Sequence, residues 1–441
     1  MPASGPEVLG PRARDPKQRF WDGHVQTMSR ERRRALQDDR VRELVRRVFE
    51  TPVPLFRHKL AHAGVDDARA VAGADDLAHL PLTRKQDLRD SEAAVPPWGD
   101  YRFTPPSACV RLGQSTGTTG TPTVMLWTRH DLWVEYESAA RNWWRMGYRP
   151  GMSITHAHPG YLYGGGVMQS GTYEYFGLLN IWVPPPDTDE RAEEGIRAWM
   201  RFRPDIPFVG FSLGRYYEVA AKLGLDPEHD IGLRVPSMLI GRHDDKGLPL
   251  MTAGLECYAY LGGPCGKSSG AHINEDWAVV QAVDPDTGVE VPDGEWGNLV
   301  VTTLDRDNPM LRYDLEEACA ITRDPCPCGE TTIRGSWGGR FGDLLTCQGI
   351  RFQPSELERA LRAGAPELAE PSLEYVIVKP SRDEPLRVRV EVGAGAFDRA
   401  ALARCCEAAI AEHLGVRAAV EVLDRGSLPR SGYKANRVVD S

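Results

Sequence analysis

The feature that most constrains this chain is a short loop rich in glycine and hydroxyl side chains, Ser115-Thr116-Gly117-Thr118-Thr119-Gly120-Thr121-Pro122-Thr123. An apolar run at residues 108–112 precedes it, and another at residues 124–127 follows it. Glycines without a β-carbon let backbone N–H groups turn toward an anion, and the hydroxyls add further donors. The loop therefore fits a polyphosphate, although a plain hairpin turn also explains its residues. It is not the phosphate loop of GTPases, because Thr121 stands where that motif needs a lysine.

Composition restricts the class of protein. A length of 441 residues predicts two or three structural units, and the net charge of −9 argues against a nucleic-acid surface. No apolar run approaches the ~20 residues of a membrane span, and residues 1–16 predict a loose tail rather than a signal peptide. Nine cysteines, an odd number, favour a reducing compartment over a disulfide framework. We expect a cytoplasmic protein that acts on a small molecule, without nucleic-acid or membrane partners.

The pattern of apolar residues predicts an α/β protein with a separate C-terminal unit. Residues 30–49 have the spacing of a helix, and Thr83 is the expected N-cap of a helix over 84–89. Alternating segments follow, with strands expected at 179–183, 208–211, 277–283 and 298–303 and a helix at 190–202. Beyond residues 335–342 we expect an α+β unit with helices 354–363 and 400–414 and strands 373–378, 386–392 and 418–423.

Several motifs occur in a fixed order along the chain. After the hydroxyl loop come Asp293-Gly294-Glu295-Trp296-Gly297, Arg312-Tyr313, Gly339-Arg340 with Asp343, and Leu428-Pro429-Arg430-Ser431-Gly432-Tyr433-Lys434. Together they resemble the adenylate-forming ligases, in particular the phenylacetate–CoA ligase branch, over nearly the whole chain. The resemblance implies a multilayer adenylation domain at 17–338, a hinge at 339–343 and a small mobile lid domain at 344–441.

The implied reaction is ATP-dependent activation of a small aromatic carboxylic acid through an acyl-adenylate, followed by transfer to CoA. Such a step needs charge neutralisation more than covalent help. The resemblance assigns the catalytic positive charges to Lys434 and Arg340. Only Lys379 and Lys434 are lysines beyond residue 340, so the choice is narrow, with a solvated surface lysine as the alternative.

The resemblance also assigns the groups that bind ATP and Mg²⁺. Residues 115–121 are the expected phosphate loop, and Glu256 closes the altered segment Thr252-Ala253-Gly254-Leu255-Glu256 as the Mg²⁺ ligand, with a surface glutamate as the alternative. Glu317 occupies the position of a ribose-binding aspartate, five residues after Arg312, and its reach is longer by one methylene. Asp343 is the expected pivot of the small domain.

A second constellation comprises Cys265, His272, Cys326 and Cys328, arranged as Cys-x6-His and Cys-Pro-Cys. Three thiolates and one imidazole form a closed tetrahedral set, which is typical of structural zinc. Some members of the resembling family carry the same four ligands. Buried free cysteines are the alternative.

The acid pocket is the least constrained part. His156, His158, Tyr161, Tyr163 and Phe211, with Phe208, are candidate pocket residues, although histidines and aromatics at strand ends often belong to the core. The segment 241–251 is shorter than in the resembling family, so we expect a rebuilt pocket.

Two other functions stay open at this point. The same machinery could act on another oxyanion or acceptor, such as nitrite in the diazotisation of an aryl amine, or the fold could serve as a binding protein without catalysis. A homodimer is an open alternative to a monomer.

Overall fold

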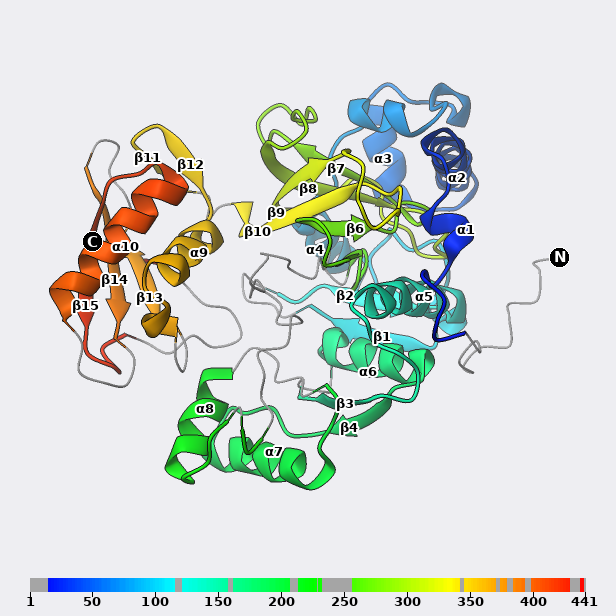
Figure 1. Ribbon diagram of the computed structural model, residues 1–441. Helices are drawn as coiled ribbons and strands as arrows, with labels where there is room; N and C mark the ends of the chain where they lie inside the picture. Colours follow the sequence, from blue (N-terminus) through cyan, green and yellow to red (C-terminus); the bar gives the residue numbers. More distant parts are fainter. Residues whose placement is uncertain are drawn as a thin grey trace. The chain divides into compact units, whose positions relative to one another are not determined.

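The computed structural model describes the chain in segments: residues 15–115, 121–157, 162–206, 213–227, 229–231, 256–341, 345–369, 373–378, 384–392, 398–428 and 437–439 (Figure 1). Two compact units divide the chain. One comprises residues 1–154, 158–181 and 248–337, and the other comprises residues 155–157, 182–247 and 338–441. Among the described residues, no helix combines the length and the apolar character that a membrane crossing needs.

The N-terminal part of the first unit is helical, with α1 (Gly23–Gln26), α2 (Arg30–Glu50), α3 (Pro54–His62), α4 (Lys85–Ala94) and the short 3₁₀ turns η1 (Ala68–Ala70), η2 (Ala74–His79) and η3 (Pro106–Ala108). Ser29 caps α2 by accepting a hydrogen bond from the N–H of Arg32, and Val41, Leu44, Val45 and Val48 are buried along one face of the helix. Thr83 is not the cap of α4, contrary to prediction. Its hydroxyl donates to the carbonyl of Leu311, so tertiary pairing takes the place of capping, and Arg84 is the cap residue.

A six-stranded sheet forms the centre of this unit, in the order β5-β6-β10-β9-β8-β7. Its strands are β5 (Gly262–Pro264), β6 (Ala271–Ile273), β7 (Ala278–Val283), β8 (Trp296–Thr303), β9 (Tyr313–Thr322) and β10 (Arg334–Arg340). Every residue of β7 is buried, because side chains from α2, α3 and β8 join it in one hydrophobic core. The strands predicted at 277–283 and 298–303 are therefore confirmed.

The hydroxyl loop connects β1 (Arg111–Gln114) and β2 (Val124–Trp127), which pair antiparallel. Next come α5 (Arg129–Arg145), β3 (Ser153–His156), α6 (Gly164–Phe176), β4 (Leu179–Trp182), α7 (Asp189–Phe202) and α8 (Leu213–Lys222). Thr128 caps α5 by accepting from the N–H of Asp131, which in turn accepts from Thr128, a reciprocal capping box. The predicted strand at 179–183 and helix at 190–202 are confirmed, whereas the strand expected at 208–211 lies outside the described residues.

The C-terminal part of the second unit is α+β, as predicted. It contains β11 (Leu345–Cys347), β12 (Ile350–Phe352), α9 (Pro354–Gly364), η5 (Pro366–Ala369), β13 (Tyr375–Val378), β14 (Leu386–Glu391), α10 (Arg399–Leu414), β15 (Ala418–Leu423) and β16 (Val438–Val439). A four-stranded sheet runs β15-β14-β13-β16, and apolar side chains of α9 and α10 share a core with β13 and β14 (Figure 1). The alternating burial along β14 shows a strand with one face toward this core.

Candidate adenylation site and metal centre

The hydroxyl loop closes on a hydrogen-bonded stem. The N–H of Ser115 donates to the carbonyl of Thr123 at 3.0 Å, and the N–H of Thr123 donates to Oγ of Ser115, also at 3.0 Å. Residues 116–120 lie outside the described residues, so the phosphate-binding role of Thr116, Gly117, Thr118, Thr119 and Gly120 stays a prediction. The stem fixes both ends of the loop at one place.

Glu256 lies directly against this stem. The hydroxyl of Thr123 donates to its Oε1 at 2.8 Å, and Nζ of Lys85 lies 2.9 Å from the same oxygen. Burial alone would raise the pKa of this carboxyl, but the charge and hydrogen bond of Lys85, together with hydrogen bonds from the backbone and Thr123, outweigh burial and hold the pKa of Glu256 below its ordinary value. The carboxylate is thus ionised, buried and beside the expected phosphate loop, which excludes the surface-glutamate alternative.

The backbone after Glu256 is held by a buried ion network. Arg306 donates to the carbonyl of Cys257 at 2.8 Å and pairs with Glu135 at 2.7 Å, and Glu135 accepts the N–H of Ala259 at 3.1 Å. Arg306 also pairs with Asp131 at 3.2 Å. Because every charge in this network has a partner, the backbone of residues 257–259, directly after Glu256, is held in place.

Helix α4 contributes side chains that sequence reasoning missed. Lys85 contacts Glu256, Arg89 donates to the carbonyl of Thr121 at 3.0 Å, and Glu92 accepts the N–H of Val124 at 3.1 Å. The helix therefore braces the C-terminal end of the loop from a segment distant in sequence. One signal was available in the sequence. The chain has only eight lysines against 45 arginines, so a lysine such as Lys85 is a candidate for a specific role.

The predicted ribose carboxylate, Glu317, lies in β9, where it accepts a hydrogen bond from the indole Nε1 of Trp337 at 2.8 Å. Arg312 has a structural role: its guanidinium donates to the carbonyls of Ala78 at 3.0 Å and Gly288 at 2.9 Å. The backbone of Arg340 ends β10, but its side chain lies outside the described part, as do Asp343 and Lys434.

Of the pocket candidates, only His156 and Tyr163 are described. His156 is buried at the end of β3 with its ring 4.2 Å from that of Trp182, centroid to centroid. Tyr163 precedes α6 and forms a parallel bridge with Gln114, next to the loop stem. His158, Tyr161, Phe208 and Phe211 lie outside the described residues, as does the shortened segment 241–251.

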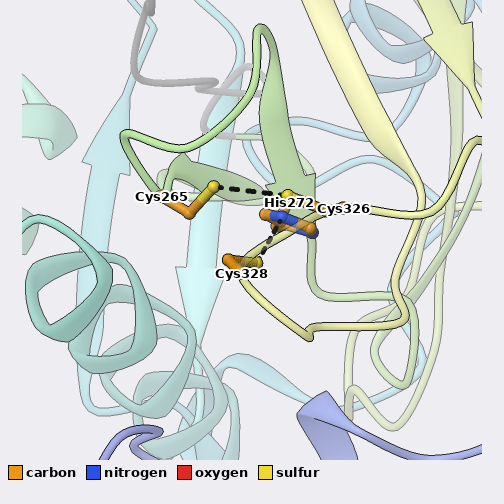
Figure 2. A group of neighbouring side chains, drawn as sticks. All are labelled: Cys265, His272, Cys326 and Cys328. Carbon is orange, nitrogen blue, oxygen red and sulfur yellow. Dashed lines mark hydrogen bonds between the residues drawn. The ribbon is translucent and has the colours of Figure 1, made fainter.

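The four predicted metal ligands do come together (Figure 2). Their ligand atoms all lie within 4.8 Å of one another; Sγ of Cys265 is 3.7 Å from Sγ of Cys326, and Sγ of Cys328 is 3.3 Å from Nε2 of His272. Tetrahedral zinc with Zn–S bonds of about 2.3 Å spaces its sulfurs by about 3.8 Å. The arrangement therefore fits a closed Cys₃His site.

The surroundings of the cluster orient its ligands. Nδ1 of His272 lies 2.9 Å from the hydroxyl of Thr332, which donates to Glu330 at 3.1 Å, and Glu330 pairs with Arg145 at 2.5 Å. This chain places the proton of a neutral imidazole on Nδ1 and turns Nε2 toward the thiols. A hydrogen bond with Cys328 lowers the pKa of the Cys265 thiol, and the same contact raises the pKa of Cys328.

Comparison with known proteins agrees with this geometry. Residues 349–441 match the family of AMP-binding enzyme C-terminal domains. The chain is 31% identical to a phenylacetate–coenzyme A ligase of Thermus thermophilus, covering 96% of this chain and 99% of that protein, and 28% identical to that of Escherichia coli, covering 94% and 96%. Among solved structures it resembles 2-hydroxyisobutyryl-CoA ligase in the postadenylation state with 2-HIB-AMP, with a TM-score of 0.81, 26% identity and coverage of 99% of this chain and 94% of that one. The chain therefore belongs to the phenylacetate–CoA ligase family of AMP-forming ligases.

Proposed function

We propose that this enzyme activates a small aromatic carboxylic acid with ATP and transfers the acyl group to CoA. The acid oxygen attacks the α-phosphorus of ATP, which gives an acyl-adenylate and pyrophosphate. The CoA thiol then attacks the acyl carbon, AMP leaves and the thiol proton is released. Support comes from the relatives named phenylacetate–coenzyme A ligase and from a structural neighbour that contains an acyl-adenylate.

The observation that carries the proposal is the ionised, buried Glu256 at the stem of the hydroxyl loop. A hard carboxylate oxygen at this position suits Mg²⁺, which neutralises phosphate charge when it is bound with ATP. The loop residues 115–121 would hold the phosphates through backbone and hydroxyl donors. We assign Lys434 and Arg340 to the charge that develops at the α-phosphate, Glu317 to the ribose and Asp343 to the hinge.

We further propose that Cys265, His272, Cys326 and Cys328 bind structural zinc. Four protein ligands leave no open coordination position, so the ion would stabilise the fold and take no part in the reaction. The Thr332–Glu330–Arg145 chain behind His272 supports this assignment, because ligand histidines are oriented by such partners. His156 and Tyr163 stay candidates for the acid pocket.

The test is ATP-dependent AMP formation by the full chain with aryl acids, short aliphatic acids and nitrite, each with and without CoA. We expect AMP and an acyl-CoA with at least one aryl acid, and loss of both products in Glu256→Gln. Glu295→Gln, an exposed carboxylate distant in sequence from the loop, is the matched control. Turnover with nitrite and with no acid would overturn the acid-activating function, and absence of AMP with every substrate would favour a binding protein.

A further inference from the structure

Strand β9 carries a bulge that sets Glu317 apart from its neighbours. Val300 of β8 pairs with Asp314 and Asn298 pairs with Ala318, so the three residues 315–317 face the single position between them. Glu316 has a φ of 54°, in the left-handed region. The local ladder is interrupted at this point, which is how sheets re-aim a side chain beside a site.

Three acidic residues lie at the bulge, Asp314, Glu316 and Glu317, and Asp314 has a role in building it. Its Oδ1 accepts the N–H of Glu316 at 2.8 Å and the amide of Asn298 at 2.5 Å, and the residue is buried. Its role is therefore that of a local turn acceptor, as aspartates often have. Glu316 is exposed, whereas Glu317 is half-buried and is the carboxylate of the bulge that a side chain of the neighbouring strand β10 engages.

A glutamate side chain has three rotatable bonds, and fixing them when a ligand binds costs conformational entropy. The indole N–H of Trp337, a donor without acceptor capacity, engages Oε2 of Glu317 at 2.8 Å. Trp337 lies in β10, the strand adjacent to β9, so the donor is attached to a rigid neighbour. Each carboxylate oxygen has two lone pairs and can accept a ligand hydroxyl as well.

From this arrangement we propose that Trp337 is a positioning residue: it holds Glu317 in the orientation that accepts the 2′- and 3′-hydroxyl protons of the ATP ribose. The inference rests on the assignment of Glu317 to the ribose in the proposed function. It makes the Glu317–Trp337 pair the determinant of selectivity for ribose over deoxyribose. If Glu317 had only a structural role, loss of the indole donor of Trp337 would leave the selectivity for ribose unchanged.

The test is calorimetric binding of Mg²⁺·ATP, 2′-deoxyATP and 3′-deoxyATP to the full chain without an acid substrate. Wild type is expected to prefer ATP over 3′-deoxyATP by about tenfold, the value of a hydrogen bond to a charged group. Glu317→Gln and Trp337→Phe should each lower this preference by about fivefold, and the double variant should lower it no further than Glu317→Gln does. Trp133→Phe, a half-buried indole in α5, is the matched control and should keep the full preference.

Full ribose preference in Trp337→Phe overturns the proposal, and additive losses in the double variant overturn it as well. Should Trp337→Phe not fold, Trp337→Leu takes its place, with the same expected loss of preference and the same overturning result. Full preference in Glu317→Gln also overturns the proposal, because Trp337 would then have no ribose carboxylate to position. Absence of ATP binding to wild type also overturns it. The protein could bind ATP with the expected selectivity and yet form no AMP with any acid or nitrite. That result would support the positioning role of Trp337 and contradict the proposed function.

Discussion

The Cys/His cluster and the Glu256 site bring polar side chains together in different ways. The four side chains of the cluster come from two segments of the chain, 265–272 and 326–328. No lysine or arginine is one of the four. The Glu256 site is assembled from α4, Thr123 of the loop stem and the turn after residue 255, and a lysine neutralises its carboxylate. Two short motifs therefore supply all four side chains of the Cys/His cluster. The ion pair of Glu256, by contrast, depends on Lys85, which no motif near Glu256 in the sequence identifies.

The largest expected effect separates the two regions by metal dependence. Cys328→Ser removes one ligand from the closed set, so we expect loss of bound zinc and a fall in the free energy of unfolding of at least about 3 kcal/mol, since structural zinc sites contribute folding energy directly. Metal analysis and thermal unfolding measure this. Cys405→Ser, an exposed cysteine in α10, is the control and should change neither quantity. Equal metal content in the two variants would mean that the four side chains are a cluster of buried thiols.

The next effect tests the Glu256 region by activity. Glu256→Gln keeps the shape of the side chain but removes the charge that we assign to Mg²⁺, and we expect kcat/KM for ATP to fall at least about hundredfold, because even indirect partners of metal ligands cost 10- to 100-fold. The zinc content should stay at the wild-type value, which keeps the two regions independent. A loss of less than about threefold would remove Glu256 from the nucleotide site.

These two regions also show how far the sequence could predict the molecule. Helices α2, α7, α9 and α10 follow from apolar periodicity, because each presents one face to a core. Strands β7, β8 and β13 follow from short continuous apolar runs, because nearly all of their residues are buried, and β14 follows from alternation. The zinc-type cluster was predictable from its spacing. The contacts of Lys85 and Trp337 were not predictable from the sequence. Lys85 meets Glu256 across a long stretch of sequence, and Trp337 meets Glu317 from a neighbouring strand. Thr83 failed as a helix cap for the same reason: a long-range bond to Leu311 outcompeted the local one.

Removal of Lys85 should convert a stabilising carboxylate into a destabilising one. The pKa of Glu256 lies below its ordinary value of 4.5 in the folded protein, so the ionised group contributes stability above pH 4.5 that is lost as pH falls through the folded pKa. In Lys85→Met, only the hydrogen bonds from Thr123 and the backbone still oppose burial, so we expect this pKa to rise. We expect a loss of about 2 kcal/mol at pH 7 that shrinks as Glu256 becomes protonated on acidification.

Chemical denaturation between pH 4 and 8, on the scale of the ordinary carboxyl pKa, measures this difference. Lys222→Met is the matched control, because Lys222 pairs with Asp189 on the exposed surface, with 65% of its side chain accessible, and should cost little at any pH. A pH-independent loss in Lys85→Met would mean that the lysine acts through packing alone. The Cys/His cluster should keep its metal in both variants.

The smallest expected effect concerns the hydroxyl that joins the loop stem to the carboxylate. The fully buried Thr123 donates to Glu256 at 2.8 Å and contacts Oγ of Ser115 at 3.1 Å. Thr123→Val preserves volume but removes both contacts, so we expect about 1 kcal/mol of lost stability and about a fivefold rise in KM for ATP, with kcat little changed. Thr287→Val, which removes an exposed turn hydroxyl bonded to Asp284, is the control and should leave KM unchanged. The substitution leaves the hydrogen bond from the N–H of Ser115 to the carbonyl of Thr123 and that from the N–H of Thr123 to Oγ of Ser115. A large loss of kcat would therefore show that the Thr123 hydroxyl orders the phosphate loop itself and not only the carboxylate beside it.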